Sequence, residues 1–315
     1  MREAFPNSFG VRGRYSGAMR RHVRLEPAYT VADPGGPPAR RLMVDVGAAA
    51  QVETMCVAPP DPAGLLLYFI GFDVALGGRE ELKCRVLAHT TGFAVVTSEI
   101  AGFARSGDPL PAGVRHDLYQ GDSAGLAAMV RRALELASVA AGVADLRPVH
   151  VLAYSTGCSL AVHAARDLAD AASMTLVEPV AVEQRNIVTL QVANTVDLVR
   201  YPQALMQNHR LAKDVRRSRM RVRFGLPDLL ALATTLSSDE LPHTRTGRMP
   251  VSLVRGGESW LCPPGGFAHL AATLAAQEIA GITATIPHLG HQLWNSVPAV
   301  AAIAEEVVAP TAAWS

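Results

Sequence analysis

Mainly apolar runs of strand length alternate with stretches of helical composition along most of this 315-residue chain. Four such runs have the character of a strand covered on both faces: residues 65–70, 93–97, 149–153 and 174–177. Further strands are expected at 250–254 and 282–286. Residues 80–89 predict an amphipathic helix, and residues 123–141 predict a longer one that Gly142 stops. Strands that alternate with helices predict an α/β fold, built on a doubly wound, mostly parallel sheet.

The alternation begins only after residue 40 and is interrupted once. Residues 1–40 contain an Asp-Pro-Gly-Gly-Pro-Pro stretch that cannot be regular structure, so we expect a loosely ordered N-terminal arm. Residues 183–248 are helical in composition, are broken by prolines and a glycine, and contain no convincing buried strand. We therefore expect an α/β core of residues 41–182 and 249–315, with residues 183–248 inserted as a helical cap.

Composition limits what such a fold can do. Hydrophobic residues make up 49% of the chain, enough for a substantial core, and the formal net charge of +1 indicates neither a nucleic-acid nor a membrane partner. The four cysteines lack C-x-x-C spacing, which argues against a zinc site and against a disulfide framework. No stretch has the pattern of a signal peptide or a membrane helix. We expect a cytoplasmic protein with no metal and no cofactor.

One strand-to-helix junction carries residues that could do chemistry. The apolar run at 149–153 leads into a Tyr-Ser-Thr-Gly turn centred on Ser155, and an Ala/Leu-rich stretch follows. With Ala153 this reads A-x-S-x-G, in which small residues flank a serine at a sharp turn. The pattern favours a serine poised for nucleophilic attack. The alternative is a buried strand followed by a helix that a Ser or Thr caps, which many α/β proteins contain.

Three further motifs accompany this serine. Ile70-Gly71-Phe72 follows a predicted strand, residues 92–106 read GFAVVTSEIAGFARS, and residues 290–298 read GHQLWNSVP. Together with the A-x-S-x-G turn, and in this order, they resemble the α/β-hydrolase superfamily over about residues 41–308. The resemblance is to serine esterases and lipases with a helical cap. The chain departs from the usual patterns at Ala153, Ile70 and Glu99, where relatives carry glycine, histidine and aspartate.

The resemblance implies roles for four residues. Ser155 would be the nucleophile, and His291 would be the general base that takes its proton. His288 lies three residues earlier, but only His291 matches the family motif. The oxyanion hole would consist of two backbone N–H groups, those of Phe72 and Thr156.

The acid that should orient the histidine has two candidates. Most relatives carry an aspartate in the turn after the strand expected at 250–254, and here that position falls on Ser259 or Trp260. Glu258 lies in the same turn, one or two positions early. Glu178 ends the preceding strand, where some members of the superfamily place their acid. We favour Glu178, because a carboxylate at a strand end has a fixed direction, and keep Glu258 as the alternative.

These residues predict a serine hydrolase that cleaves a carboxylic ester or thioester of a small molecule through an acyl-enzyme. A basic cluster at residues 209–223 of the cap would suit an anionic substrate, although such a run is more often a solvated helix face. The same site could pass the acyl group to an acceptor other than water, or the chain could be a non-catalytic, ligand-binding relative. The oligomeric state is open, with a homodimer as one option.

Overall fold

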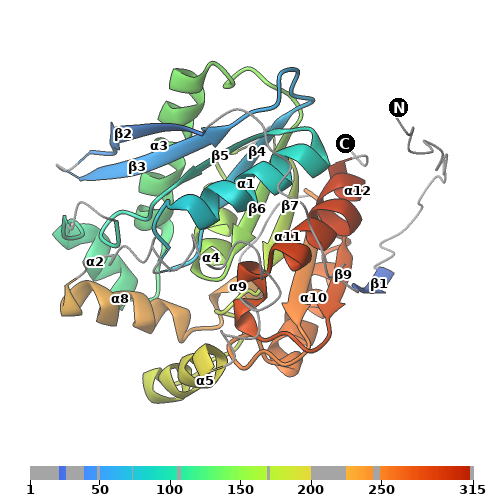
Figure 1. Ribbon diagram of the computed structural model, residues 1–315. Helices are drawn as coiled ribbons and strands as arrows, with labels where there is room; N and C mark the ends of the chain where they lie inside the picture. The colour runs from blue at the N-terminus through green and yellow to red at the C-terminus, as the bar shows by residue number, and fades with distance from the viewer. Residues whose placement is uncertain are drawn as a thin grey trace.

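The structure is a computed structural model that describes residues 21–25, 39–47, 50–72, 74–104, 108–168, 171–199, 225–243 and 249–312 (Figure 1). Most of the predicted N-terminal arm and the whole basic cluster at 209–223 lie outside these residues. The described residues form one sheet that helices cover on both faces.

Nine strands of the described chain form this sheet, in the order β1-β9-β8-β7-β6-β4-β5-β3-β2. They are β1 (Arg21–Arg24), β2 (Arg40–Asp45), β3 (Gln51–Val57), β4 (Leu65–Phe69), β5 (Ala94–Ser98), β6 (Val149–Tyr154), β7 (Ala171–Val177), β8 (Val251–Gly256) and β9 (Ile282–Ile286). β3 pairs antiparallel with β2 and with β5, while the other neighbours are parallel. The predicted α/β fold with a mostly parallel sheet is therefore confirmed.

Helices pack on the two faces of the sheet in pairs (Figure 1). α1 (Gly78–Thr91) packs with α11 (Val297–Ile303) on one face, and α3 (Ala124–Ala141) packs with α4 (Thr156–Ala164) on the other. A helix packs against a sheet through its apolar side. In α3, for example, buried residues recur every three or four positions, at Leu126, Val130, Leu134 and Ala137. The remaining helices of the α/β part of the chain are α2 (Ala112–Tyr119), α10 (Pro264–Ala276), the 3-10 helix η1 (His291–Asn295), the π-helix η2 (Ala304–Val308) and α12 (Ala309–Ala312).

Between β7 and β8 the described chain holds α5 (Ile187–Val199), α8 (Leu226–Leu236) and α9 (Glu240–His243). α5 and α8 lie along the lower edge of the molecule in Figure 1. Helix α2, which packs against α8, was not predicted, because Leu118 is its only buried residue and leaves little periodicity. The boundaries of the N-terminal arm, the core and the cap stay predictions. Within the predicted arm, Arg21–Arg24 forms β1 and pairs with β9 at the edge of the sheet.

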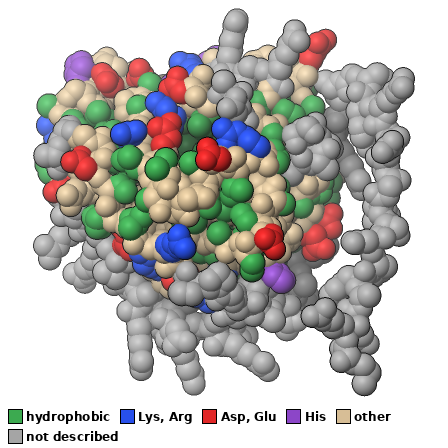
Figure 2. Space-filling model, turned by 90° about the horizontal axis from the view of Figure 1, so that it is seen from above, with side chains coloured by type: hydrophobic (Ala, Val, Ile, Leu, Met, Phe, Trp, Pro, Cys, Tyr) green, Lys and Arg blue, Asp and Glu red, His purple; other side chains and the backbone are tan. Residues whose placement is uncertain are grey.

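The described surface gives two further findings. No described helix is long and apolar enough to cross a lipid bilayer. Figure 2 views the molecule from above, and on that face acidic and basic side chains are interspersed among apolar and uncharged groups. The described residues of that face therefore form no large field of one sign.

His150 in β6 predicts a pH-dependent stability. Its buried ring stacks on Phe93 with 4.9 Å between ring centroids, and its Nδ1 lies 2.8 Å from Ser173 Oγ. Burial lowers the pKa of His150 from 6.5 to about 4, so between these values the unfolded chain binds more protons than the folded protein. The free energy of unfolding should therefore fall as the pH drops through this range, by up to about 1.4 kcal/mol per pH unit from this group.

Urea unfolding of the wild type and of His150→Gln, between about pH 6.5 and about pH 5, measures this effect. Glutamine can still bond the Ser173 hydroxyl but does not titrate, so the wild type should lose stability more steeply than the variant. Equal slopes for the two proteins would contradict the assignment to His150.

Candidate functional site

Ser155 lies at the tight turn between β6 and α4, with φ 57° and ψ −122°. A residue with a side chain rarely adopts a positive φ, so the surrounding structure must hold the turn. A Cβ atom on Gly157 would lie 2.3 Å from Phe69 O, and one on Gly71 would lie 2.9 Å from the Tyr154 ring. The small residues around the serine thus have a steric cause, because β4 and the loop after it pass too close for larger ones.

The structure brings Ser155, His291 and Glu178 together in one hydrogen-bonded chain. Ser155 Oγ lies 2.8 Å from His291 Nε2, and His291 Nδ1 lies 2.8 Å from Glu178 Oε2. Ser155 directly follows β6, Glu178 directly follows β7, and His291 begins η1 after the loop that leaves β9. All three side chains are buried. With a carboxylate at Nδ1, the neutral imidazole carries its proton there, which leaves Nε2 able to accept one from the serine.

Glu178 is held by more than the histidine. The Gly256 N–H donates to its Oε1, and Ser259 Oγ donates to its Oε2 at 2.5 Å. Ser259 in turn accepts the N–H of Cys262 at 3.0 Å. The turn after β8, where relatives place an acid, here supplies hydrogen-bond donors to a carboxylate from the neighbouring strand. Glu178 therefore has a single fixed direction toward His291.

The rival residues lie elsewhere. Glu258 Oε1 is 3.9 Å from His288 Nδ1, and these side chains are 42% and 83% exposed. Such an exposed pair contributes little to stability, because water screens the two charges.

Cys158, three residues after the serine, is fully buried, and burial raises the pKa of its thiol well above the usual value. It therefore stays protonated and is no competing nucleophile.

Aromatic rings pack behind His291. Tyr154 stacks on the imidazole with 5.4 Å between centroids, and its hydroxyl donates to His291 O at 3.0 Å. Trp294 stacks on Tyr154, and its Nε1–H donates to the Tyr68 hydroxyl. Burial raises the pKa of Tyr68 well above its usual value, so this hydroxyl stays protonated and can donate to Glu80 at 3.3 Å. The stack and these bonds fix the plane of the imidazole.

The two predicted oxyanion donors adjoin the serine. Thr156 is the first residue of α4, where backbone N–H groups have no partner within the helix. Phe72 follows Gly71, on which a Cβ atom would come within 3.2 Å of Ser155 Cβ. The Phe72 ring packs edge-on against Phe103, with 5.4 Å between centroids. Both N–H groups thus belong to segments that touch Ser155.

Asp197, a buried carboxylate beside the site, was missed in the sequence. It lies in α5, and its Oδ1 accepts the N–H of His291 at 3.3 Å. A signal was present, because Asp197 is the only charged residue in the helix Ile187–Val199. A charge that is buried needs fixed hydrogen-bond partners, and only the tertiary structure reveals which they are.

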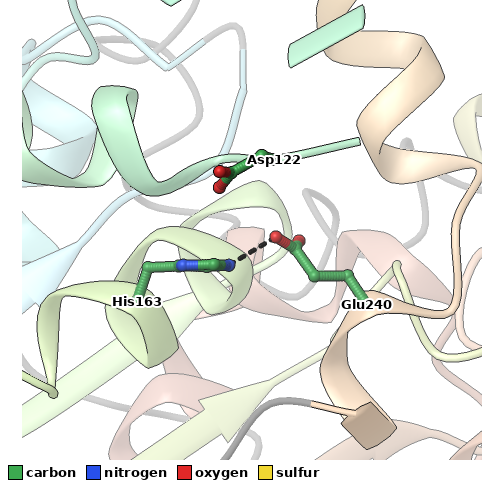
Figure 3. A group of neighbouring side chains, drawn as sticks. All are labelled: Asp122, His163 and Glu240. Atoms are coloured by element: carbon green, nitrogen blue, oxygen red, sulfur yellow. Dashed lines mark hydrogen bonds and ion pairs between the residues drawn. The ribbon is translucent and has the colours of Figure 1, made fainter. Parts of the chain in front are cut away.

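A second cluster of titratable groups lies away from the serine. Asp122, His163 and Glu240 point toward one another, and their ligand atoms all lie within 4.8 Å (Figure 3). This spacing could suit a divalent cation. However, His163 Nε2 already bonds Glu240 Oε1 at 2.5 Å, and His163 Nδ1 is buried without a partner among the described residues. A metal-bound histidine almost always donates its other N–H, so we interpret this contact as a pair that ties α9 to α4.

Comparisons with known proteins identify the fold. No family model matches the sequence, and no curated protein matches it. A lipase in its open form is similar in structure, with a TM-score of 0.62 and 18% identity over 88% of this chain and 98% of that one. The proline iminopeptidase-related protein from Thermus thermophilus has a TM-score of 0.56 and 18% identity, over 86% of this chain and 99% of the other.

The thioesterase domain from the curacin biosynthetic pathway is also similar, with a TM-score of 0.54 and 16% identity over 86% of this chain and all of that domain (100%). At such identities the likeness speaks for the fold alone. With its sheet order and the helices on both faces, this chain has the α/β-hydrolase fold, as the resemblance in the sequence implied.

Proposed function

We propose that this protein is a serine hydrolase that cleaves a carboxylic ester or thioester of a small molecule through an acyl-enzyme. The observation that carries this proposal is the buried chain from Ser155 Oγ through His291 to Glu178, with 2.8 Å at each link. The similar structures support the choice of bond, since they include a lipase and a thioesterase domain.

The first half-reaction acylates the serine. Ser155 Oγ attacks the carbonyl carbon while His291 Nε2 takes the hydroxyl proton, and Glu178 stabilises the imidazolium that results. The oxyanion accepts hydrogen bonds from the N–H groups of Phe72 and Thr156. The intermediate then expels the alcohol or thiol, which receives the proton from His291, and the acyl group stays on Ser155.

The second half-reaction frees the serine. A water molecule gives a proton to His291 Nε2 as it attacks the acyl carbon, and the same two N–H groups receive the oxyanion. Ser155 Oγ leaves and recovers its proton from His291, and the carboxylic acid is released. This chemistry needs neither a metal nor a cofactor. The anionic substrate, the homodimer and the cytoplasmic location stay predictions.

A fluorophosphonate probe tests the proposal, because it phosphonylates serines that a neighbouring base has activated. Folded wild type should gain the mass of one phosphonyl group on the peptide that contains Ser155. Turnover of p-nitrophenyl esters and acyl thioesters should disappear in parallel, and heat-denatured protein should stay unlabelled. Folded protein that is neither labelled nor active would favour a ligand-binding relative instead. Added alcohol or amine acceptors distinguish hydrolysis from acyl transfer by the products.

A further inference from the structure

The carboxylate of Asp197 accepts three backbone N–H groups from two different segments of the chain. Oδ1 receives the N–H of His291 at 3.3 Å, and Oδ2 receives those of Trp260 and Leu261 at 3.0 and 2.9 Å. Asp197 is fully buried near the end of α5. These N–H groups stabilise the buried charge of the carboxylate, and the positive charge of Arg185 also interacts with it.

Arg185, just before α5, holds the same turn from its carbonyl side. Its Nη1 donates to Trp260 O at 3.2 Å, and its Nη2 donates to Leu261 O at 2.7 Å and to Val180 O at 2.9 Å. The peptide groups of Trp260 and Leu261 are therefore fixed at both ends, by an anion at their N–H groups and a cation at their carbonyls.

This turn bears directly on the proposed catalytic residues. It carries Ser259, whose hydroxyl donates to Glu178, and the N–H of Gly256 at its start also donates to Glu178. The other segment that Asp197 holds is η1, which begins at His291 itself. Asp197, which lies between β7 and β8, thus holds both His291 and the turn whose Ser259 donates to Glu178.

We propose that Asp197 is a positioning residue, which sets the distance and direction between His291 and Glu178 and through them the reactivity of Ser155. This inference rests on the proposed hydrolase function. It costs free energy to keep this carboxylate charged where it lies, because burial raises the pKa of Asp197. The hydrogen bonds from the N–H groups of Leu261 and His291 oppose that rise. A carboxylate near the carboxyl end of a helix is also disfavoured by the helix dipole. Asparagine would remove the charge and one acceptor while keeping the volume.

The test compares Asp197→Asn with Asp228→Asn. Asp228 is also a buried carboxylate, in α8, but it accepts the Leu110 N–H and pairs with Arg115, and neither partner is one of the proposed catalytic residues. In Asp197→Asn we expect kcat for a p-nitrophenyl ester and the rate of fluorophosphonate labelling to fall by about 10²-fold, with KM little changed. In Asp228→Asn both should stay within about twofold of wild type, whatever its melting temperature.

The outcomes separate the two proposals. If Asp197→Asn is folded and as active as Asp228→Asn, while the wild type is labelled and active, Asp197 has only a structural role and the inference is wrong. If the folded wild type is inert, the hydrolase proposal is wrong and the positioning role is lost with it. Should Asp197→Asn not fold, Asp197→Ser takes its place. Asp197→Glu, which keeps the carboxylate, should recover part of the lost kcat.

Discussion

Ser155→Ala is expected to lower kcat for ester hydrolysis by about 10⁶-fold. The reason is chemical, since no acyl-enzyme can form without the oxygen that lies 2.8 Å from His291 Nε2. Removing the whole nucleophile leaves only the oxyanion donors and the binding surface, which retain a small residual rate over water. Steady-state kinetics with p-nitrophenyl esters, in protein freed of any contaminating esterase, measure the loss.

Ser159→Ala is the matched control. Ser159 is also a buried serine of α4, and its hydroxyl has no hydrogen-bond partner among the described residues. Removing that hydroxyl should leave kcat unchanged and should leave the melting temperature equal or raise it, because an unsatisfied buried group is lost. A Ser155→Ala variant that keeps more than about a tenth of wild-type kcat would contradict the nucleophile assignment.

Glu178→Gln should lower kcat by about 10⁴-fold. A glutamine can turn its NH₂ group toward His291 Nδ1, which would place the imidazole proton on Nε2 and prevent it from accepting the serine proton. It also cannot neutralise the imidazolium that forms during the reaction. The melting temperature is measured alongside, because the Gly256 N–H and the Ser259 hydroxyl lose a charged acceptor.

Glu258→Gln serves as the control for that variant. The Glu258 side chain is 42% exposed beside the more exposed His288, so the same chemical change there should leave kcat within about twofold of wild type. The reverse pattern, with a large loss at Glu258 and none at Glu178, would make Glu258 the orienting acid.

The framework of the fold could be predicted because its signals are local. Strands buried on both faces need continuous apolar runs, and the run at 65–70 forms β4, Leu65–Phe69. Helix α2 escaped prediction, since its one buried residue, Leu118, gives no period. Asp197 escaped because its partners lie 63, 64 and 94 residues away in the chain.

The sequence alone predicted the turn at Ser155, because the small residues that such a turn requires stand beside the serine in the chain, as Gly157 does. For the acid it favoured Glu178 but left Glu258 open, since both lie in plausible turns. Only the tertiary structure brings Glu178 within 2.8 Å of a histidine 113 residues away and leaves Glu258 beside His288. That choice depends on strand order, on the direction of the strand ends and on the α5 contacts, none of which a local pattern encodes.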